Sequence, residues 1–352
     1  MEQQGTFTSL CRDELLLCGI GAGDTVAVLS QGQGHQVAYG DAFSDAARSL
    51  GAQTFTVTLP TTGEYDLGSI GGTVGATPLA GNAAAVEALK QADLVVDLVF
   101  LLFSPEQLEI QASGTRVLLV VEPPDNLARM FPTPDLRRRV EYGEQLLGTA
   151  TRLQVSNPHG TDVTYEIGTF PIITEYGYTD TPGRWDHWPG GLVATGAHET
   201  GVNGRVVLAP GDIIYPFKTY VQTPIDLRIE DGFIVDISGG LDAELLEGFM
   251  QTFDDPKAYG ISHIGWGLNE RAQWSALIND KRSLGMDGRT FYGNVLFSTG
   301  PNTELGGDND TLCHLDIPMR GCTLRLDDQV IVRDGDIVIS EMQAASGVRQ
   351  TS

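Results

Sequence analysis

The hydrophobic and polar positions of the first 150 residues predict strands that alternate with helices. Apolar runs typical of buried strands are found at 25–30, 53–60, 94–102 and 116–124. Helix-forming patterns separate them at 37–51 and 82–92. Near-continuous apolar strands separated by helices indicate a parallel sheet that is covered on both faces. We therefore expect residues 1–150 to form an α/β N-terminal domain with an open parallel sheet and a layered architecture.

From about residue 150 the pattern changes to short segments in which polar and apolar residues alternate, as in antiparallel hairpins. Such segments occur at 152–156, 162–168, 204–216, 225–240 and 323–339. The pairs Asp231-Gly232 and Asp334-Gly335 favour tight hairpin turns. One helix pattern, at 241–253, lies among the strands. Residues 151–352 are therefore predicted to form a β-rich α+β domain.

The composition is that of a folded globular chain, because 41% of its 352 residues are hydrophobic and 19% are charged. The longest apolar run, 94–103, contains Asp97 and is about half as long as the roughly 20 residues that span a bilayer. The N-terminus has no basic segment followed by an apolar core, so we expect no secretory signal. The four cysteines form no Cys-x-x-Cys pair, and this usage fits a reducing cytoplasm best.

The formal net charge of −24 argues against nucleic acid and membrane surfaces as partners, because phosphates and anionic lipids would be repelled. The one basic run, Arg137 to Arg139, belongs to a polar helical pattern. We interpret it as a solvated helix face.

A phosphate-binding loop is the first candidate for chemistry, because Gly32 and Gly34 lie between a predicted strand and a predicted helix. The dinucleotide fingerprint needs a third glycine, and this chain has Val37 there. It also needs an acidic residue after the second strand, where the chain reads Leu59-Pro60. We interpret the two glycines as turn residues.

A metal site is the second candidate. His314 and Asp316 are two residues apart in a predicted strand, so both side chains should project from the same face. A histidine and a carboxylate make up two-thirds of the facial triad that holds non-haem Fe(II). Taken alone, however, this motif is more typical of a histidine hydrogen-bonded to a neighbouring aspartate.

The other histidines differ in their surroundings. His263 lies in the Gly-rich, aromatic segment YGISHIGWGLN and is the best candidate for a third ligand. His187 is flanked by tryptophans in PGRWDHWPGG, where it could be either an acid or base or a packed core residue. His35, His159 and His198 lie in polar loops and are expected at the surface.

Over nearly its full length the chain resembles the 2,5-dihydroxypyridine 5,6-dioxygenases of bacterial nicotinate and nicotine breakdown. These enzymes are an iron-dependent offshoot of the thermophilic, M29-type metallo-aminopeptidases. The matching segments are LLFSPEQ (101–107), VEPPDNLARMFPT (121–133), TEYGYTDTPGRWDHWPGG (174–191), YGISHIGWGLNERAQW (259–274), FYGNVLFSTGPNTE (291–304) and CHLDIPMRGC (313–322).

The resemblance implies one Fe(II) ion bound by His263, His314 and Asp316, with the β-rich domain carrying the metal. It implies that O₂ opens the ring of the hydroxypyridine substrate to give N-formylmaleamate. It also implies a tendency to form homo-oligomers. Glu175, Ser104 and Arg289 are the candidate substrate-binding residues, and His187 is a candidate catalytic group. For Arg289 the alternative is a salt bridge to Asp287 or another carboxylate.

Two alternatives from other classes are a metallo-aminopeptidase and a non-catalytic binding protein on the same scaffold. The related peptidases bind two metals, and their counterpart of 291–307 carries a metal-binding histidine that is missing here. His263 stands where they use a glutamate. Both differences favour one iron ion over two peptidase metals.

One position departs from the family pattern. The Leu-Leu-x-Ser-Pro-Glu-Gln motif carries a histidine at x that resembles the catalytic acid or base, whereas this chain has Phe103. Phenylalanine cannot transfer protons, and such assistance is typically worth about 10²–10⁴-fold in rate. The chain is a divergent member with another substrate, His187 has taken over the role, or Phe103 is a substitution that traps the substrate on the iron. We favour the third explanation, because the other pocket motifs are intact.

Overall fold

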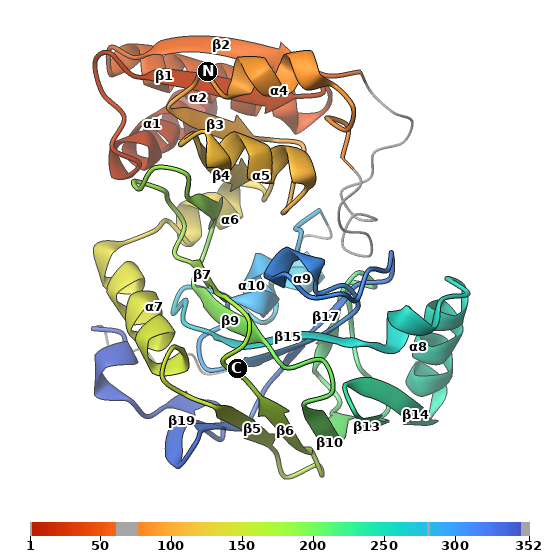
Figure 1. Ribbon diagram of the computed structural model, residues 1–352. Helices are drawn as coiled ribbons and strands as arrows, with labels where there is room; N and C mark the ends of the chain where they lie inside the picture. The colour runs from red at the N-terminus through yellow and green to blue at the C-terminus, as the bar shows by residue number, and fades with distance from the viewer. Residues whose placement is uncertain (1, 61–76, 280–281, 346–352) are drawn as a thin grey trace. The chain divides into compact units, whose positions relative to one another are not determined.

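The computed structural model describes residues 2–60, 77–279 and 282–345, which form two compact units (Figure 1). The α/β unit comprises the described parts of Met1–Asp66 and Val74–Pro132 together with Tyr176–Gly190. The β unit comprises Thr133–Glu175 and the described parts of Gly191–Ser352. The chain thus passes between the units more than once. The expected division of the chain into two domains, 1–150 and 151–352, stays a prediction.

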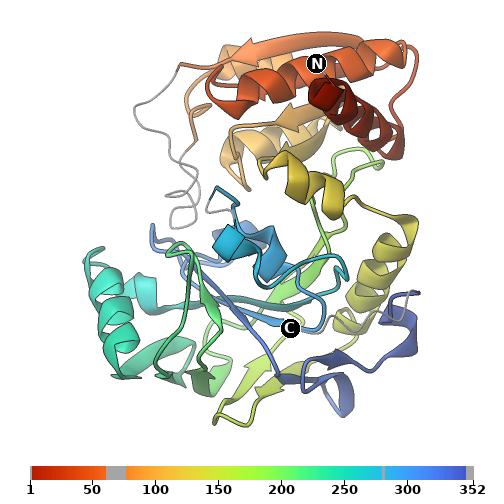
Figure 2. The same cartoon turned by 180° about the vertical axis from the view of Figure 1, so that it is seen from behind.

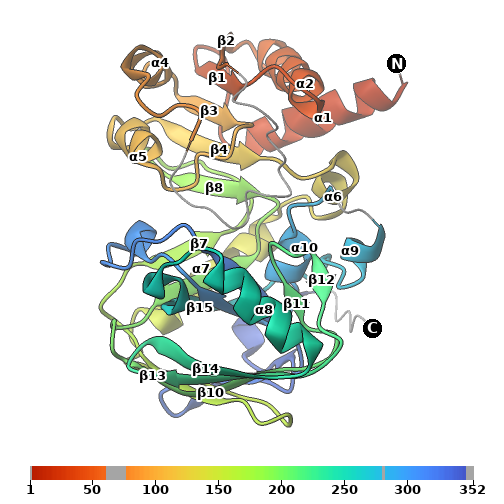
Figure 3. The ribbon, with the colours of Figure 1, turned by 90° about the vertical axis from the view of Figure 1, so that its right-hand side faces the viewer.

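The α/β unit is built on a five-stranded parallel sheet in the order β2-β1-β3-β4-β8. Helices cover both faces, α1 and α2 on one and α4 and α5 on the other (Figure 3). The strands are β1 (Thr25–Ser30), β2 (Gln53–Thr58), β3 (Leu94–Asp97), β4 (Arg116–Val120) and β8 (Trp185–Trp188). The helices are α1 (Glu2–Leu17), α2 (His35–Ser49), α4 (Ala83–Leu89), α5 (Pro105–Ala112) and α6 (Pro124–Arg129). The predicted parallel α/β sheet is confirmed.

The third strand is shorter than the predicted 94–102. It ends at Asp97, whose carboxylate accepts hydrogen bonds from the main-chain N–H groups of Val99 and Leu101, both at 2.8 Å. Phe100 follows with a φ of 64°, a left-handed conformation outside the extended β region. The apolar run continues past this point because the loop residues are also buried. Hydrophobicity alone therefore overestimated the strand.

The β unit contains two antiparallel sheets and a short ribbon (Figures 1 and 2). The larger sheet has the order β14-β13-β10-β6-β5-β18-β19-β20, and the smaller sheet has the order β17-β16-β15-β9-β7. The larger sheet consists of β5 (Arg152–Ser156), β6 (Asp162–Glu166), β10 (Val202–Leu208), β13 (Ile225–Glu230), β14 (Phe233–Gly239), β18 (Thr323–Leu326), β19 (Gln329–Arg333) and β20 (Asp336–Ile337). The smaller sheet consists of β7 (Ile172–Glu175), β9 (Leu192–Gly196), β15 (Ile261–Gly267), β16 (Val295–Thr299) and β17 (Leu315–Met319), and the ribbon of β11 (Ile213–Ile214) and β12 (Thr219–Tyr220).

Helices and turns of the β unit complete its frame. The helices are α7 (Pro134–Leu147), α8 (Leu241–Gln251), α9 (Ala276–Asn279) and α10 (Met286–Arg289), with short 3₁₀ turns at Pro256–Tyr259, Thr303–Leu305 and Ser340–Met342. The predicted hairpin turns are confirmed, because Asp231 and Gly232 have φ of 47° and 80° and join β13 to β14. A side chain at Gly232 would place its Cβ 1.9 Å from the Glu199 carbonyl oxygen, so only glycine fits. The predicted β-rich fold is therefore present.

The prediction for the basic run was wrong at one residue. Arg139 on α7 has no exposed surface, and its guanidinium binds the carboxylates of Asp135 and Glu270 and the carbonyl of Leu268. A helix with a 3.6-residue period turns one of three consecutive residues inward. The buried cation is compensated because each of its three nitrogens donates to an acceptor.

Candidate metal centre

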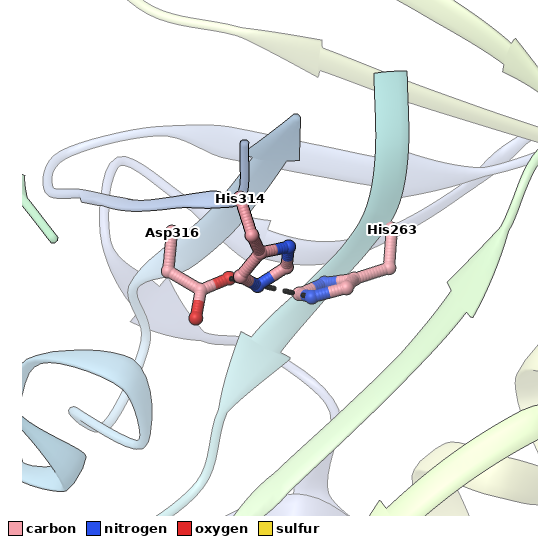
Figure 4. Close-up of side chains that lie close together, drawn as sticks. All are labelled: His263, His314 and Asp316. Atoms are coloured by element: carbon pink, nitrogen blue, oxygen red, sulfur yellow. Dashed lines mark ion pairs between the residues drawn. The ribbon is translucent and has the colours of Figure 1, made fainter. Parts of the chain in front are cut away.

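Neighbouring segments of the smaller sheet position the three predicted ligands. His263 lies on β15, Asp316 lies on β17, and His314 immediately precedes β17. β16 runs between these two strands. The three side chains point toward one another, and His314 and Asp316 project on the same side, as their spacing predicts (Figure 4).

The donor atoms of the three side chains converge. Nε2 of His263 and Nε2 of His314 each lie 3.3 Å from Oδ1 of Asp316. All three donor atoms lie within 4.8 Å of one another. Among the residues that the structure describes, this is the one group of three or more histidine, cysteine, aspartate or glutamate side chains that could hold a metal ion.

The arrangement fits a single metal ion. Oδ1 of Asp316 is shielded from solvent, and no described residue donates a well-aligned hydrogen bond to it. Two ligand atoms bound to one ion at about 2.1 Å are separated by roughly 3.0–3.4 Å when their angle lies between square and tetrahedral. The observed separations of 3.3 Å fall in this range. Two histidines and one carboxylate would leave other coordination positions open.

Arg289 fixes the orientation of the Asp316 carboxylate. Its Nε donates to Oδ2 of Asp316 at 2.7 Å, which leaves Oδ1 directed at the histidines. The guanidinium is itself held, because one terminal nitrogen donates to the carbonyl of Leu284 at 2.7 Å and the group lies 4.2 Å from the ring centroid of Tyr215. The salt bridge to a carboxylate, predicted as the alternative for Arg289, is thus present, and its partner is the candidate metal ligand Asp316. Its role as an anchor for substrate stays a prediction.

The electrostatics of the centre favour an ionised carboxylate. Burial alone would raise the pKa of Asp316, but His314, Arg289 and His263 together hold that pKa well below its ordinary value. Burial alone would lower the pKa of His314, but the carboxylates of Asp316 and Glu304 outweigh it and raise the pKa. The ionised form of Asp316 is therefore favoured, and this is the form that binds a cation.

Glu304 and Ser298 also belong to the surroundings of the centre and were not predicted. Glu304 is half-buried, its Oε1 lies 3.5 Å from Oγ of Ser262, and burial raises its pKa although the nearby histidines oppose the shift. Ser298 on β16 is directly opposite Asp316 in the sheet register and is fully buried. In the sequence, residues 291–307 were considered only because they lack the metal-binding histidine of the related peptidases. Glu304, in a stretch with few charged residues, was the one signal that could have drawn attention to this segment.

Phe103 lies in an aromatic group of the α/β unit. Its φ is 54°, so this non-glycine residue occupies the left-handed region, and its main-chain N–H donates to Oε1 of Gln107 at 3.1 Å. Its ring centroid lies 4.9 Å from that of Trp185, and the Trp185 ring lies 6.3 Å from the imidazole of His187. The structure thus brings Phe103 and His187 to the same aromatic side chain.

Ser104 has a structural task in addition to the predicted contact with substrate. It is the N-cap of α5, where its Oγ accepts a hydrogen bond from the main-chain N–H of Gln107 at 3.2 Å. Pro105 at the first helical position strengthens this helix start. The hydroxyl is fully buried. To bind substrate as predicted, the Ser104 hydroxyl would have to contact it while still accepting the N-cap hydrogen bond.

The remaining candidates divide into buried and exposed residues. His187 on β8 is buried, and Glu175 is buried at the end of β7, the edge strand farthest from β17 in the smaller sheet. Their roles toward substrate stay predictions. His35, His159 and His198 are exposed, as predicted.

Two histidines and an aspartate that converge on a β sheet could hold one metal ion, and this donor set is the kind that non-haem iron oxygenases use. The profile of a family described as 2,5-dihydroxypyridine 5,6-dioxygenase (NicX) matches residues 6–339. The chain belongs to this dioxygenase family. The family predicted from the sequence segments is confirmed.

Individual relatives agree with this assignment. A curated 2,5-dihydroxypyridine 5,6-dioxygenase of Pseudomonas putida is 51% identical over 312 residues, which are 87% of this chain and 88% of that protein. A solved structure of 2,5-dihydroxypyridine dioxygenase from Pseudomonas putida KT2440 matches with a TM-score of 0.92 at 47% identity, over 97% of this chain and 99% of that one. AmpT from Thermus thermophilus matches with a TM-score of 0.58 at 14% identity, over 95% and 99% of the two chains, and shows a shared fold alone.

Proposed function

We propose that this chain is a ring-opening dioxygenase that converts 2,5-dihydroxypyridine and O₂ to N-formylmaleamate with Fe(II) as its metal. The observation that carries the proposal is the convergence of His263, His314 and Asp316 in a chain of this family. A centre with this donor set suits Fe(II) because two imidazoles and one carboxylate satisfy it while leaving positions open.

The chain's own residues would perform distinct tasks. Bound Fe(II) would supply adjacent open positions that bring the substrate and O₂ together in the correct orientation. His263, His314 and Asp316 would hold the metal, and Arg289 would keep Oδ1 of Asp316 directed at it. His187 is the candidate for proton transfer in place of the histidine that the family has at position 103, and substrate contacts are assigned to Glu175 and Ser104 from the family pattern.

A single cluster of candidate ligands favours the dioxygenase over an aminopeptidase. A two-metal hydrolase needs a second set of ligands, and residues 2–60, 77–279 and 282–345 contain the one cluster described above. Residues 291–307 contain no histidine. Phe103 supports the third candidate, a binding protein that holds the substrate without converting it.

One sequence of additions separates the three functions. The protein is loaded with Fe(II) without oxygen, then mixed with 2,5-dihydroxypyridine, and then exposed to O₂. Ring-opened product, detected by mass spectrometry with consumption of one O₂ per substrate, is the result we expect. Substrate-induced changes in the iron spectrum without product indicate a binding protein. Hydrolysis of aminoacyl amides with two metals per chain would contradict the proposal.

Arg289 gives a prediction about metal affinity. We expect Arg289→Gln to weaken Fe(II) binding about 10–100-fold, because the carboxylate would lose the partner that orients it. Removing a positive charge acts in the opposite direction, and Arg289→Lys separates the two effects since it keeps the charge but not the planar fork. A metal titration followed by calorimetry measures the change. Arg333→Gln, at an exposed residue of β19, is the control. Equal or tighter binding in Arg289→Gln would contradict an orienting role.

The cellular setting is inferred from general properties. Four cysteines are buried and unpaired, which supports a reducing cytoplasm. None of the helices that the structure describes is long and apolar enough to cross a membrane. The charge of −24 supports a small-molecule substrate over nucleic acid or membrane partners. We propose a homo-oligomer from the family's tendency.

A further inference from the structure

The β unit contains a cavity apart from the three candidate metal ligands. Its volume is about 380 Å³, which is within the range of small-molecule sites. Three chain segments line it, at 209–212, 291–294 and 320–321, with contributions from His159, Asp334 and Gly335. None of the three metal ligands is among the lining residues.

Arg320 provides the cation that a ligand in this cavity would meet. Its guanidinium lies 5.3 Å from the ring centroid of Trp274, and the indole Nε1 donates to the carbonyl of Gly211 in the cavity wall at 2.8 Å. Within the described part of the chain, the guanidinium forms no ion pair with a carboxylate. A guanidinium placed over an aromatic ring keeps its N–H edge available for two parallel hydrogen bonds.

The two carboxylates of the cavity, Asp212 and Asp334, accept hydrogen bonds that stabilise the surrounding loops. Oδ1 of Asp212 accepts from the main-chain N–H of Arg320 at 3.0 Å, and Oδ2 accepts from that of Ala209 at 2.8 Å. Asp334 accepts a hydrogen bond from the hydroxyl of Thr323 at 3.2 Å. The oxygens of these carboxylates thus have partners within the loops, whereas Arg320 is the lining side chain that can donate to a ligand, and the rings of Phe291 and Tyr292 also line the cavity.

Two walls of the cavity lead to Arg289, the residue that orients Asp316. Nδ2 of Asn294 donates to the carbonyl oxygens of Gly288 and Arg289 at 2.6 and 3.1 Å. The wall at 209–212 continues into Tyr215, whose ring lies against the Arg289 guanidinium. The main-chain N–H of Tyr215 also donates to the carbonyl of Asp316 at 2.9 Å.

The third wall leads to the ligands themselves. Arg320 directly follows β17, the strand that carries Asp316. A ligand that moves any of the three walls would thus act on the same carboxylate. Coupling of this kind requires a shared element that both sites bias, and Asp316 with Arg289 would be that element.

We propose that this cavity is a regulatory site for small planar carboxylates, recognised by Arg320 and coupled to the metal centre. The carboxylate would form the two-point contact with the guanidinium, and the planar body would lie against Phe291 and Tyr292. The ring-opened product belongs to this chemical class, so the site would sense the product. Sensing of the product rests on the proposed function, whereas binding of a carboxylate in the cavity does not.

Maleamate is the probe, and its neutral diamide, maleamide, is the matched ligand without a carboxylate. We expect calorimetry to detect maleamate binding to the Fe(II)-loaded protein under anaerobic conditions and to detect much weaker binding of maleamide. Arg320→Gln should weaken maleamate binding about 10–100-fold, since a charge-assisted hydrogen-bonded pair is lost. Arg333→Gln should leave it unchanged. His314→Ala should retain maleamate binding, which places the ligand away from the metal.

Unchanged binding in Arg320→Gln, or loss of binding in His314→Ala, would overturn the site. Coupling is measured as the affinity for 2,5-dihydroxypyridine, without O₂, in the presence and absence of saturating maleamate. We expect a change of about fivefold or more that disappears in Arg320→Gln. Maleamate binding with no such change would overturn the regulatory role. Failure of 2,5-dihydroxypyridine to bind at all would instead count against the proposed function.

Discussion

His314→Ala is expected to remove the metal and with it all ring-opening activity. Metal sites with four protein ligands contribute about 10–16 kcal/mol, so one ligand is worth roughly 3 kcal/mol or about 10²-fold in affinity. The loss should be larger here, because only two donors would remain and the Asp316 carboxylate would turn to Arg289, its nearest cation at 2.7 Å. Iron content after desalting and O₂ consumption measure the two effects.

Asp316→Asn tests the same centre with a side chain of almost equal shape. It removes the negative charge that His314, Arg289 and His263 favour at Asp316 by lowering its pKa, and it leaves an amide at the position of the carboxylate. We expect the same loss of iron. His198→Ala is the matched control, because this histidine is exposed in a loop of the same unit. Full iron content in either centre variant would contradict the assignment of ligands.

Phe103→His is expected to raise turnover of 2,5-dihydroxypyridine by up to about 10²–10⁴-fold, the usual value of a positioned acid or base. The backbone favours the change, because φ is 54° at this position and histidine adopts the left-handed region more readily than phenylalanine. The imidazole can also keep the contact with Trp185 that the phenyl ring makes at 4.9 Å. Single-turnover kinetics at fixed iron content measure the effect.

Phe103→Asn is the control for this gain, since asparagine also tolerates the left-handed backbone but transfers no proton at neutral pH. The activity of Phe103→His should rise with pH around the ordinary histidine pKa of about 6.5. The activity of Phe103→Asn should show no such pH dependence. Equal or lower activity in Phe103→His, with iron unchanged, would show that Phe103 does not block proton transfer.

His187→Gln distinguishes the second explanation for Phe103. If His187 has taken over proton transfer, this change in the parent chain should lower turnover about 10²-fold or more. Phe103→His would then restore activity lost in His187→Gln. If Phe103 only traps the substrate, His187→Gln should have little further effect. The burial of His187 makes a thermal unfolding measurement necessary beside the kinetics.

The layered α/β sheet and the antiparallel hairpins were predictable because each depends on local periodicity and turn residues. Strand β8 was not, because Trp185–Trp188 is four residues long and lies in the antiparallel part of the sequence, yet it pairs in parallel with β4. Parallel pairing between distant segments leaves no local pattern. The end of β3 was missed for a related reason, since the Asp97 carboxylate replaces strand hydrogen bonds in a loop that stays buried.

The grouping of the three candidate ligands was partly predictable. The spacing of His314 and Asp316 places two donors on one face, but nothing in the local pattern joins them to His263 on another strand. The family resemblance supplied that link, and the structure supplied the distance of 3.3 Å. The pairing of Arg289 with Asp316 could only be read from three dimensions, because the two residues belong to a helix and a strand that the chain separates.

The central claim is a single metal ion per chain on His263, His314 and Asp316. The most direct test is the metal content of the protein after anaerobic loading with Fe(II) and removal of free metal. The account predicts one iron per chain in the parent and in His198→Ala, and none in His314→Ala or Asp316→Asn. Two metals per chain in the parent, or one iron retained in either ligand variant, would contradict it.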